Sequence, residues 1–257
     1  MTGGTPFPLR TVVHLEGPAG PVATDLFTLR EGIAAAPPEC LFHHVMRLPL
    51  RHAHARDLPA NDFARWVGVA LQDPETAERL AFVGTPGLTP LEEVRAALLA
   101  VLDGARAPRP RTVAPEEAAF PFIRSSSIVV SLEIEARDPA GIVDAWPGLD
   151  PAAVFFHLIE ARLLGPADAW LPDWFRDRGE SRLAGVAEEM AGRGRSVLAL
   201  QRELGLAWRR SLIARRLARR AEAPESVRQR DGREAMVKLA RRLRGGDQPA
   251  TTGEDGP

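Results

Sequence analysis

Two histidines and two aspartates at similar spacings are the residues of this chain that could perform chemistry. Asp62 follows His44 by 18 residues, and Asp173 follows His157 by 16 residues. An imidazole can donate or accept a hydrogen bond, bind a metal or titrate near neutral pH, and a neighbouring carboxylate can fix its tautomer. His44, His157, Asp62 and Asp173 are therefore candidates for a composite acid–base or metal site.

The same residues also have a structural interpretation. Asn61 is a favourable N-cap residue, and Asp62 would follow it in the first helical turn, where an acidic side chain complements the helix dipole. A buried histidine can also fix the register of two packed units without taking part in catalysis. One histidine in each unit is too few groups to define an active site. The sequence favours the structural interpretation and leaves the composite site as the alternative.

A metal site has weaker support. On an α-helix the adjacent His43 and His44 would point about 100° apart, so they are not expected to share one ion. His52 and His54 form the other chelating pair, in a polar segment without counterparts in the second half. The sequence contains no HExxH pattern, no cysteine ligand set, no nucleophile elbow and no phosphate-binding loop. No metal or other cofactor is predicted.

Composition narrows the class of protein. The chain has 257 residues, 45% of them hydrophobic and 26% charged, which is typical of a soluble globular protein. No apolar run approaches the roughly 20 residues of a membrane span, and no secretory signal is visible. The single Cys40 cannot form an internal disulfide and is expected to be a small buried residue, not a nucleophile. We therefore expect a cytoplasmic protein without a transmembrane segment.

Helix signals place the first histidine and aspartate on neighbouring helices. Asp25 is the expected N-cap of a helix that ends before the next prolines. The helix that carries His44 should run from about Pro38 toward Pro49, where proline kinks or ends it. The Asp62 helix follows after a polar loop.

Further capping signals divide the rest of the chain. Asp73, Asp138 and Asp150 each precede a proline that would occupy the first helical position. Thr89 is expected to cap another helix, with Glu92 returning the capping bond. These signals predict several short helices in each half.

An internal repeat relates the two halves. The segment from Asp25 to His44 matches the segment from Asp138 to His157 at a constant offset of 113 residues. This register aligns apolar and proline positions, namely Leu29 with Ile142, Ile33 with Trp146, Pro38 with Pro151 and Phe42 with Phe155. A repeat of this kind predicts two similar units that pack on a pseudo-twofold axis.

The expected fold class is mainly α, with two pseudo-repeated helical units and one short β-strand in each. The strands are predicted at 11–15 and 126–135 and are expected to pair with each other. The predicted organisation is a first helical repeat at 7–105, a linker at 106–119, a second helical repeat at 120–205, basic C-terminal amphipathic helices at 206–244 and a disordered tail at 245–257.

The C-terminal region is strongly basic. From Arg193 to Arg244 there are 16 Arg and Lys against 5 Asp and Glu, a balance of +11 that leaves −12 for the remainder. This surface would suit an anionic polymer, a membrane or an acidic partner, or it is simply a solvated helix face. No nucleic-acid-binding fold signature is present, so nucleic acid is not the expected partner. The candidate partner-binding residues are Arg209, Arg210, Arg215, Arg216, Arg219 and Arg220.

The apolar stripe of this region predicts two amphipathic helices. The first stripe comprises Leu204, Trp208, Leu212 and Leu217, and the second comprises Met236, Val237, Leu239 and Leu243.

The F-H-H motif at 42–44 and the N-D-F-A-R-W motif at 61–66 resemble those of an uncharacterised bacterial family, domain of unknown function 5752. The two motifs are followed by the segments L-Q-D-P-E-T-A-E-R-L and T-P-L-E-E-V-R, which are also part of the resemblance. The resemblance covers roughly residues 7–205 and is closer in the first repeat, since Pro172 replaces Asn61 in the second and Trp66 has no clear equivalent there. It implies a tandem helical architecture and an association with sugar metabolism, but no established activity.

The expected function is that of a non-catalytic accessory, interaction or ligand-binding module for a protein or a small molecule. One alternative is a hydrolase-like or metal-dependent enzyme with its His/Asp site at the repeat interface. The other is anionic-polymer binding through the arginine-rich helices. The sequence indicates no substrate, partner or oligomeric state.

Overall fold

The computed structural model describes residues 5–84, 88–105 and 112–222, together with Arg233, Met236, Val237 and Ala240. The chain divides into two units, Met1–Arg209 and Arg210–Pro257. The described residues are mainly α-helical with one two-stranded sheet, so the predicted fold class is confirmed. Within those residues, no helix is both long and apolar enough to cross a membrane.

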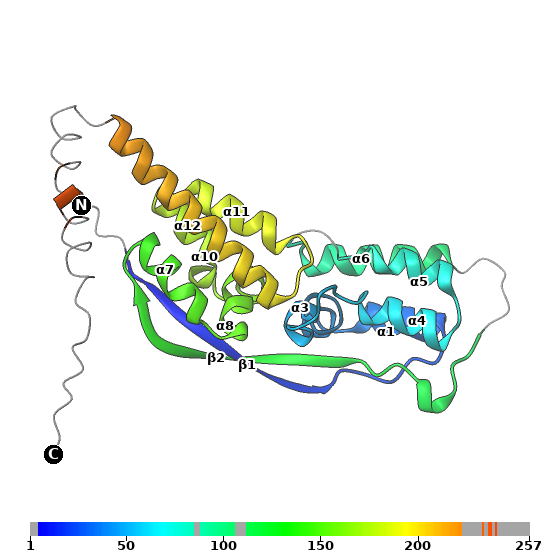
Figure 1. The fold of residues 1–257 in the computed structure, drawn as a ribbon. Coiled ribbons are helices and arrows are strands. Elements are labelled where there is room, and N and C mark those ends of the chain that lie inside the picture. The colour runs from blue at the N-terminus through cyan, green and yellow to red at the C-terminus, as the bar shows by residue number, and fades with distance from the viewer. Residues whose placement is uncertain are drawn as a thin grey trace, which may run out of the picture. The chain divides into compact units, whose positions relative to one another are not determined.

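A long antiparallel ribbon runs along the helices of the first unit (Figure 1). It consists of β1 (Phe7–Pro18) and β2 (Ile123–Ala136), the only two strands among the described residues. Val12 pairs with Val129, which confirms the predicted pairing.

Both strands extend beyond their predicted bounds, over 12 and 14 residues, so the expectation of short strands is wrong. Apolar alternation marked only part of each strand. The extensions include exposed residues such as Glu16 and Pro18, because pairing along a solvated ladder depends on backbone hydrogen bonds and not on burial. A register shift between Leu9 and Arg10 lies opposite Glu133, whose φ of 56° marks a bulge.

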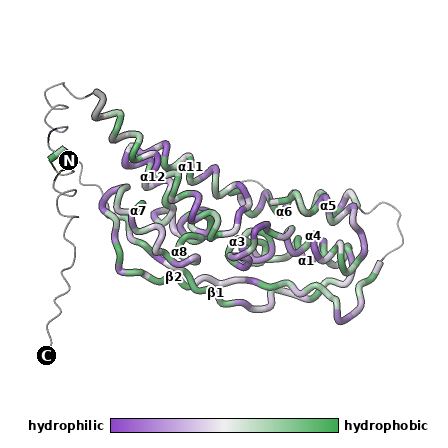
Figure 2. The backbone as a smooth tube through the Cα atoms, viewed as in Figure 1, coloured by the Kyte–Doolittle hydropathy of each residue, from purple (hydrophilic) through white to green (hydrophobic). Residues whose placement is uncertain are grey.

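Among the described residues of the first half, seven helical segments follow β1. Figure 2 shows that hydrophobic and hydrophilic residues alternate along the helices of both halves. The segments are α1 (Leu26–Ala35), α2 (Pro38–Leu41), the π-helical turn η1 (Phe42–Met46), α3 (Leu48–Arg51), α4 (Asp62–Ala70), α5 (Pro74–Ala81) and α6 (Leu91–Gly104). The short 3₁₀ turn η2 (Glu116–Ala118) precedes β2.

The second half has its helices and π-turn in the same order. They are α7 (Pro139–Ala145), η3 (Trp146–Gly148), α8 (Pro151–Phe155), the π-helical turn η4 (Phe156–Glu160), α9 (Ala161–Leu163), η5 (Ala167–Ala169), α10 (Leu171–Asp177), α11 (Ser181–Ala191) and α12 (Val197–Glu222). This order is compatible with an internal repeat, and the pseudo-twofold relation remains a prediction.

Most of the predicted N-caps are confirmed. The residues whose side chains accept a backbone N–H of the helix that they precede are Asp25, Asn61, Asp73, Asp138 and Asp150. The predicted cap at Thr89 is wrong, since the helix begins at Leu91 without a side-chain cap. The carboxylate of Glu92 instead accepts the Nε–H of Arg95 at 2.9 Å, so it does not return a capping bond.

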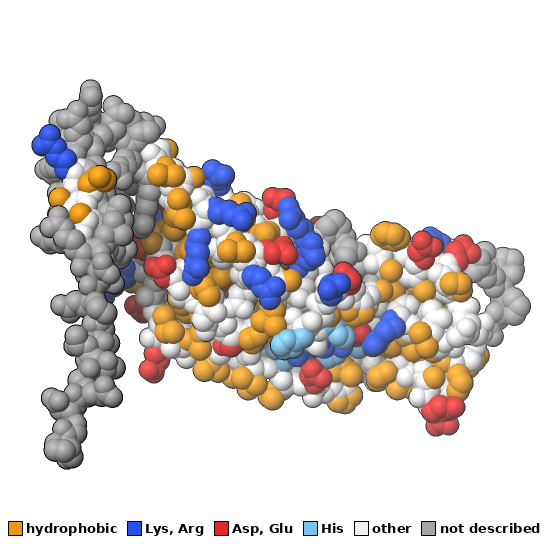
Figure 3. Space-filling view, in the orientation of Figure 1, with side chains coloured by type: hydrophobic (Ala, Val, Ile, Leu, Met, Phe, Trp, Pro, Cys, Tyr) orange, Lys and Arg blue, Asp and Glu red, His pale blue; other side chains and the backbone are white. Residues whose placement is uncertain are grey.

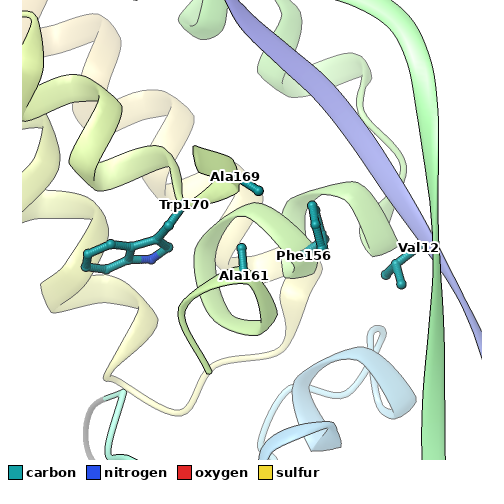
Figure 4. Packing of buried hydrophobic residues seen from close by; sticks show 5 residues of the cluster. All are labelled: Val12, Phe156, Ala161, Ala169 and Trp170. Atoms are coloured by element: carbon teal, nitrogen blue, oxygen red, sulfur yellow. The ribbon is translucent and has the colours of Figure 1, made fainter. Parts of the chain in front are cut away.

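Aromatic and polar side chains meet in the core between the two halves. The rings of Phe42 and Phe155 lie 5.8 Å apart, and His14 of β1 lies 6.4 Å from each. The Nε2 of His14 also bonds the buried carboxylate of Glu160 at 2.8 Å. Beside them, a small cluster holds β1 against the second half (Figure 4), with Val12, Phe156, Ala161, Ala169 and Trp170 as its members.

The outer side of the ribbon is apolar. The side chains of Val13, Leu15, Ile128 and Val130 are between 42% and 56% exposed. In Figure 3 hydrophobic side chains line the lower edge of the molecule, where Figure 1 places β1 and β2.

The predicted apolar stripe of α12 is only partly buried. Leu204 and Trp208 are buried, and the Trp208 ring lies 4.9 Å from Trp146 and 5.1 Å from Phe175. Leu217, in contrast, is 62% exposed. The predicted second amphipathic helix lies outside the described residues, except for Met236 and Val237, and so does the predicted tail at 245–257.

Candidate functional site

A π-helical turn brings His43 and His44 together. Their ring centroids lie 4.8 Å apart, with the ring planes at 77°. The expected angle of about 100° assumed α-helical spacing, whereas residues 42–46 form a π-helical turn. The turn places both histidines in the buried interior.

Both ring nitrogens of His44 are committed to hydrogen bonds. Its Nε2 accepts the backbone N–H of Ile123 at 3.0 Å, at the start of β2. The proton of the neutral ring is therefore on Nδ1, which donates to Oδ2 of Asp62 at 3.0 Å. Burial lowers the pKa of His44, although the bond to Asp62 works in the opposite direction. His44 is therefore neutral, and its two hydrogen bonds join Ile123 of β2 to Asp62 of α4.

Asp62 stands at the first position of α4, directly after its Asn61 cap. Its Oδ2 also accepts Arg51 Nη2 at 2.5 Å, and its Oδ1 accepts Arg65 Nη2 at 3.3 Å. Burial alone would raise the pKa of Asp62, but the hydrogen bond from His44 and the charge of Arg51 lower it. Asp62 is therefore an ionised carboxylate held by three donors.

His43 belongs to a second group of hydrogen-bonded polar residues, together with Ser125, Arg47 and Glu16. Its Nδ1 lies 2.7 Å from the hydroxyl of Ser125, which accepts Arg47 Nη1 at 2.6 Å. Arg47 also donates to Glu16 at 2.7 Å. Since an arginine can only donate, the Ser125 O–H is free to donate to His43 Nδ1. Burial lowers the pKa of His43 to about 4, so its ring is neutral. Because Nδ1 accepts hydrogen bonds from Ser125 and Arg47, the ring proton is on Nε2.

A pocket of about 580 Å³ opens beside these groups. One end is polar and is lined by His43, His44, Arg51, Asp62 and Arg65. The walls are mainly apolar and come from α4 and the segment before β2, with Trp66, Val69, Ala70, Phe120, Pro121 and Ile123 as the main contributors. Trp66 is fixed in this wall, since its Nε1–H donates to the carbonyl of Ala118 at 2.7 Å.

The second half places its histidine differently. Nε2 of His157 accepts the N–H of Arg10 at 2.9 Å, and Nδ1 donates to the carbonyl of Ala169 at 2.8 Å. Burial lowers the pKa of His157 to about 4. Asp173 is half-exposed and bonds Arg176 at 2.7 Å. The structure therefore brings His44 and Asp62 together, but it does not bring Asp173 to His157.

Three potential metal-ligand groups, His43, His44 and Asp62, have one ligand atom each within 4.8 Å of one another. His52 and His54 lie in the turn after α3 and do not belong to this group. His44 already uses both nitrogens, so a metal on Nδ1 would require it to lose its proton or its bond to Ile123. The ion pair of Asp62 with Arg51 opposes a cation at the same place.

Sequence reasoning missed several members of the site. Arg51 lies beyond Pro49, where the predicted histidine helix kinks or ends, and Ser125 lies just before the predicted strand at 126–135. The spacing of Arg47 and Arg51 from His44 was a usable signal, because residues three and seven positions apart share a helix face. The contact of Ser125 with His43 joins residues 82 positions apart, and no local pattern predicts it.

The arginine-rich candidates lie at the carboxyl end of α12. Arg209 and Arg210 are exposed. The side chains of Arg215, Arg216, Arg219 and Arg220 lie outside the described part of the structure. Binding of an anionic polymer by these residues remains a prediction.

Comparisons with known proteins assign the chain to a family. The solved structure of OrfY from Thermoproteus tenax is similar, with a TM-score of 0.66 and 29% sequence identity over 82% of this chain and 95% of that chain. No curated protein matches the sequence. Residues 4–202 match the family described as "Family of unknown function (DUF5752)". Since this match spans well over half of the 257 residues, the chain belongs to that family of unknown function.

Proposed function

We propose that the protein is a non-catalytic ligand-binding module with an accessory role, and that the pocket beside His43 and Asp62 is its binding site. The observation that carries this proposal is the form of the pocket. It combines a volume of about 580 Å³ with a charged end and apolar walls. Small-molecule sites typically have volumes of about 300–1,000 Å³, apolar walls and a few fixed polar groups.

The state of the polar groups favours binding over catalysis. A general base needs a free acceptor, but His44 and His157 use both ring nitrogens in the fold. Ser125 is a potential nucleophile beside His43, yet it is only 1% exposed and does not line the pocket. A substrate in the pocket would therefore not reach it.

The composite-site enzyme has less support than the binding module. Its four groups would have to converge, whereas Asp173 pairs with Arg176 at the surface and His157 is sealed in the interior. A metal-dependent version is tested by metal analysis of the purified protein. A stoichiometric metal that disappears in His43→Ala and in Asp62→Asn would favour that enzyme over our proposal.

Native mass spectrometry of the purified full chain tests the binding module. Ala70 lines the pocket, so Ala70→Phe should fill it, whereas Ala97→Phe places the same side chain on an exposed position of α6. We expect a small-molecule adduct, or a stabilising compound in a thermal-shift library, with wild type and Ala97→Phe but not with Ala70→Phe. The adduct's identity would also test the expected association with sugar metabolism. Equal binding by all three proteins, or none by any, would contradict the proposal.

A further inference from the structure

We propose that the ligand of this pocket is a small monocarboxylate with an apolar body, whose carboxylate lies at the end formed by His43, Arg51 and Arg65. This inference rests on the proposed binding function and adds the chemical class of the ligand. It follows from which hydrogen-bonding groups at that end are already used and which are left over.

The acceptors at the polar end are largely occupied. A carboxylate offers about four acceptor positions. Asp62 uses three of them for His44, Arg51 and Arg65. His44 has no acceptor left, because its Nε2 binds the N–H of Ile123. A ligand that mainly donates hydrogen bonds would find few partners here.

The donors, in contrast, are not exhausted. His43 lines the pocket and, with Nδ1 acting as an acceptor, keeps an N–H on Nε2. Arg51 has five N–H groups and makes one side-chain hydrogen bond, through Nη2, while its Nε is buried without a partner. Arg65 adds a second, more exposed guanidinium. The polar end therefore offers several donors and few free acceptor positions.

The balance of charge points to one negative charge on the ligand. Two guanidinium groups face one carboxylate, and both histidines are neutral, so the polar end has a net charge of +1. A monoanion would neutralise it, and a planar carboxylate matches the fork of a guanidinium. A dianion would leave one negative charge uncompensated, and a cation would meet two arginines.

The apolar walls determine the rest of the ligand. Trp66 and Phe120 present aromatic surface, and Val69, Ala70 and Pro121 add aliphatic surface. The carboxylate would bind the donors, and the apolar body would contact these walls in the same pocket. A flat aromatic acid is a simple probe of this arrangement.

Isothermal titration of the full chain with 2-naphthoate and with its neutral isostere 2-naphthamide tests the ligand class. We expect naphthoate to bind about tenfold or more tightly than the amide, since hydrogen bonds to a charged group are among the strongest in proteins. Arg51→Gln should abolish this preference, and Arg65→Gln should weaken it. Arg30→Gln, which removes a charge that pairs with Asp103 on the surface, should leave it unchanged.

The possible failures are distinguishable. Equal binding of acid and amide by wild type would overturn the monocarboxylate and leave the binding module intact. A preference that survives both Arg51→Gln and Arg65→Gln would place the acid at other donors and would also overturn it. If Arg51→Gln does not fold, as judged by circular dichroism, the exposed Arg65→Gln decides. Absence of binding by either probe would reject this ligand class, while the adduct experiment tests the binding function separately.

Discussion

Replacing His157 tests whether the histidines of this protein serve its structure. His157→Phe keeps an aromatic ring in a position with 0% exposure, but it removes one acceptor and one donor. The N–H of Arg10 and the carbonyl of Ala169 then lose their partners. A buried unpaired group costs about 1–3 kcal/mol, so the free energy of unfolding should fall by roughly 4 kcal/mol at pH 7. A typical domain has only about 5–15 kcal/mol of stability, so this loss would be large.

The same substitution should change the pH dependence of stability. The pKa of His157 falls from 6.5 to about 4 on folding, so between these values the unfolded chain binds a proton that the folded chain does not. Stability contributed by His157 is therefore present above pH 6.5 and is lost as the pH falls toward 4. At 1.36 kcal/mol per pKa unit the loss is about 3 kcal/mol. The difference between wild type and His157→Phe should shrink from roughly 4 to roughly 1 kcal/mol over this range.

Urea unfolding followed by circular dichroism, at several pH values between 4 and 7.5, measures both effects. His157→Gln keeps an acceptor for Arg10 and should recover about half of the loss. His54→Phe, at an exposed position of the turn after α3, should change stability by less than about 0.5 kcal/mol. The structural role would be refuted if His157→Phe cost under about 1 kcal/mol, or if its effect did not change with pH.

Two further substitutions test the packing around the site, both by urea unfolding. Asn61→Ala removes the cap of α4 and the donor to the carbonyl of Leu80 at 2.7 Å, and we expect a loss of about 2–3 kcal/mol; a loss below 0.5 kcal/mol would show that the cap is replaceable. Gly32→Ala would place its Cβ 2.1 Å from the ring of Phe122, and we expect a loss of stability of about 1–3 kcal/mol. Gly148→Ala is the control, since its Cβ would meet no atom within 4 Å and should be nearly neutral. Equal losses of stability for the two variants would contradict the close approach of Gly32 to Phe122.

Local signals predicted the backbone elements that carry the site. Asn61 caps its helix as expected, because an asparagine before an amphipathic segment satisfies orphan amide groups wherever the segment packs. Asp62 consequently occupies the first helical position, close to a preceding helix that ends at Arg51. Capping therefore predicts the helix position of Asp62, and the structure adds its hydrogen bond with His44 at 3.0 Å.

Long-range contacts determined the remainder of the site. Nothing in the F-H-H-V-M segment signals the extra residue of η1. The histidines of that turn are held by hydrogen bonds to Ile123 and Ser125, which lie 79 and 82 residues further along the chain. A π-turn is less favourable than α-helix, so contacts of this kind must stabilise it. Sequence periodicity contains no information about them, which is why it predicts an ordinary α-helix at this segment.

The predicted repeat separates the structural role of the histidines from the proposed binding role of their neighbours. At the offset of 113, His44 corresponds to His157, and the N–H groups that they accept belong to Ile123 and Arg10, which are related by the same offset. One histidine therefore joins each half to one strand of the ribbon.

Two of the three donors of the pocket do not follow this pattern. At the same offset His43 corresponds to Phe156 and Arg51 to Leu164, so the second half replaces these two donors by apolar side chains. Arg65 has a counterpart in Arg176, since each donates to the aspartate three residues before it. Phe156 is buried and contacts Val12 in the core. Had the histidine and its neighbours formed one functional unit, both halves should retain or lose them together. Instead, each half retains the histidine that binds a strand, and only the first half has His43 and Arg51. The proposed ligand site in the first half alone, on a fold held by both histidines, accounts for this difference.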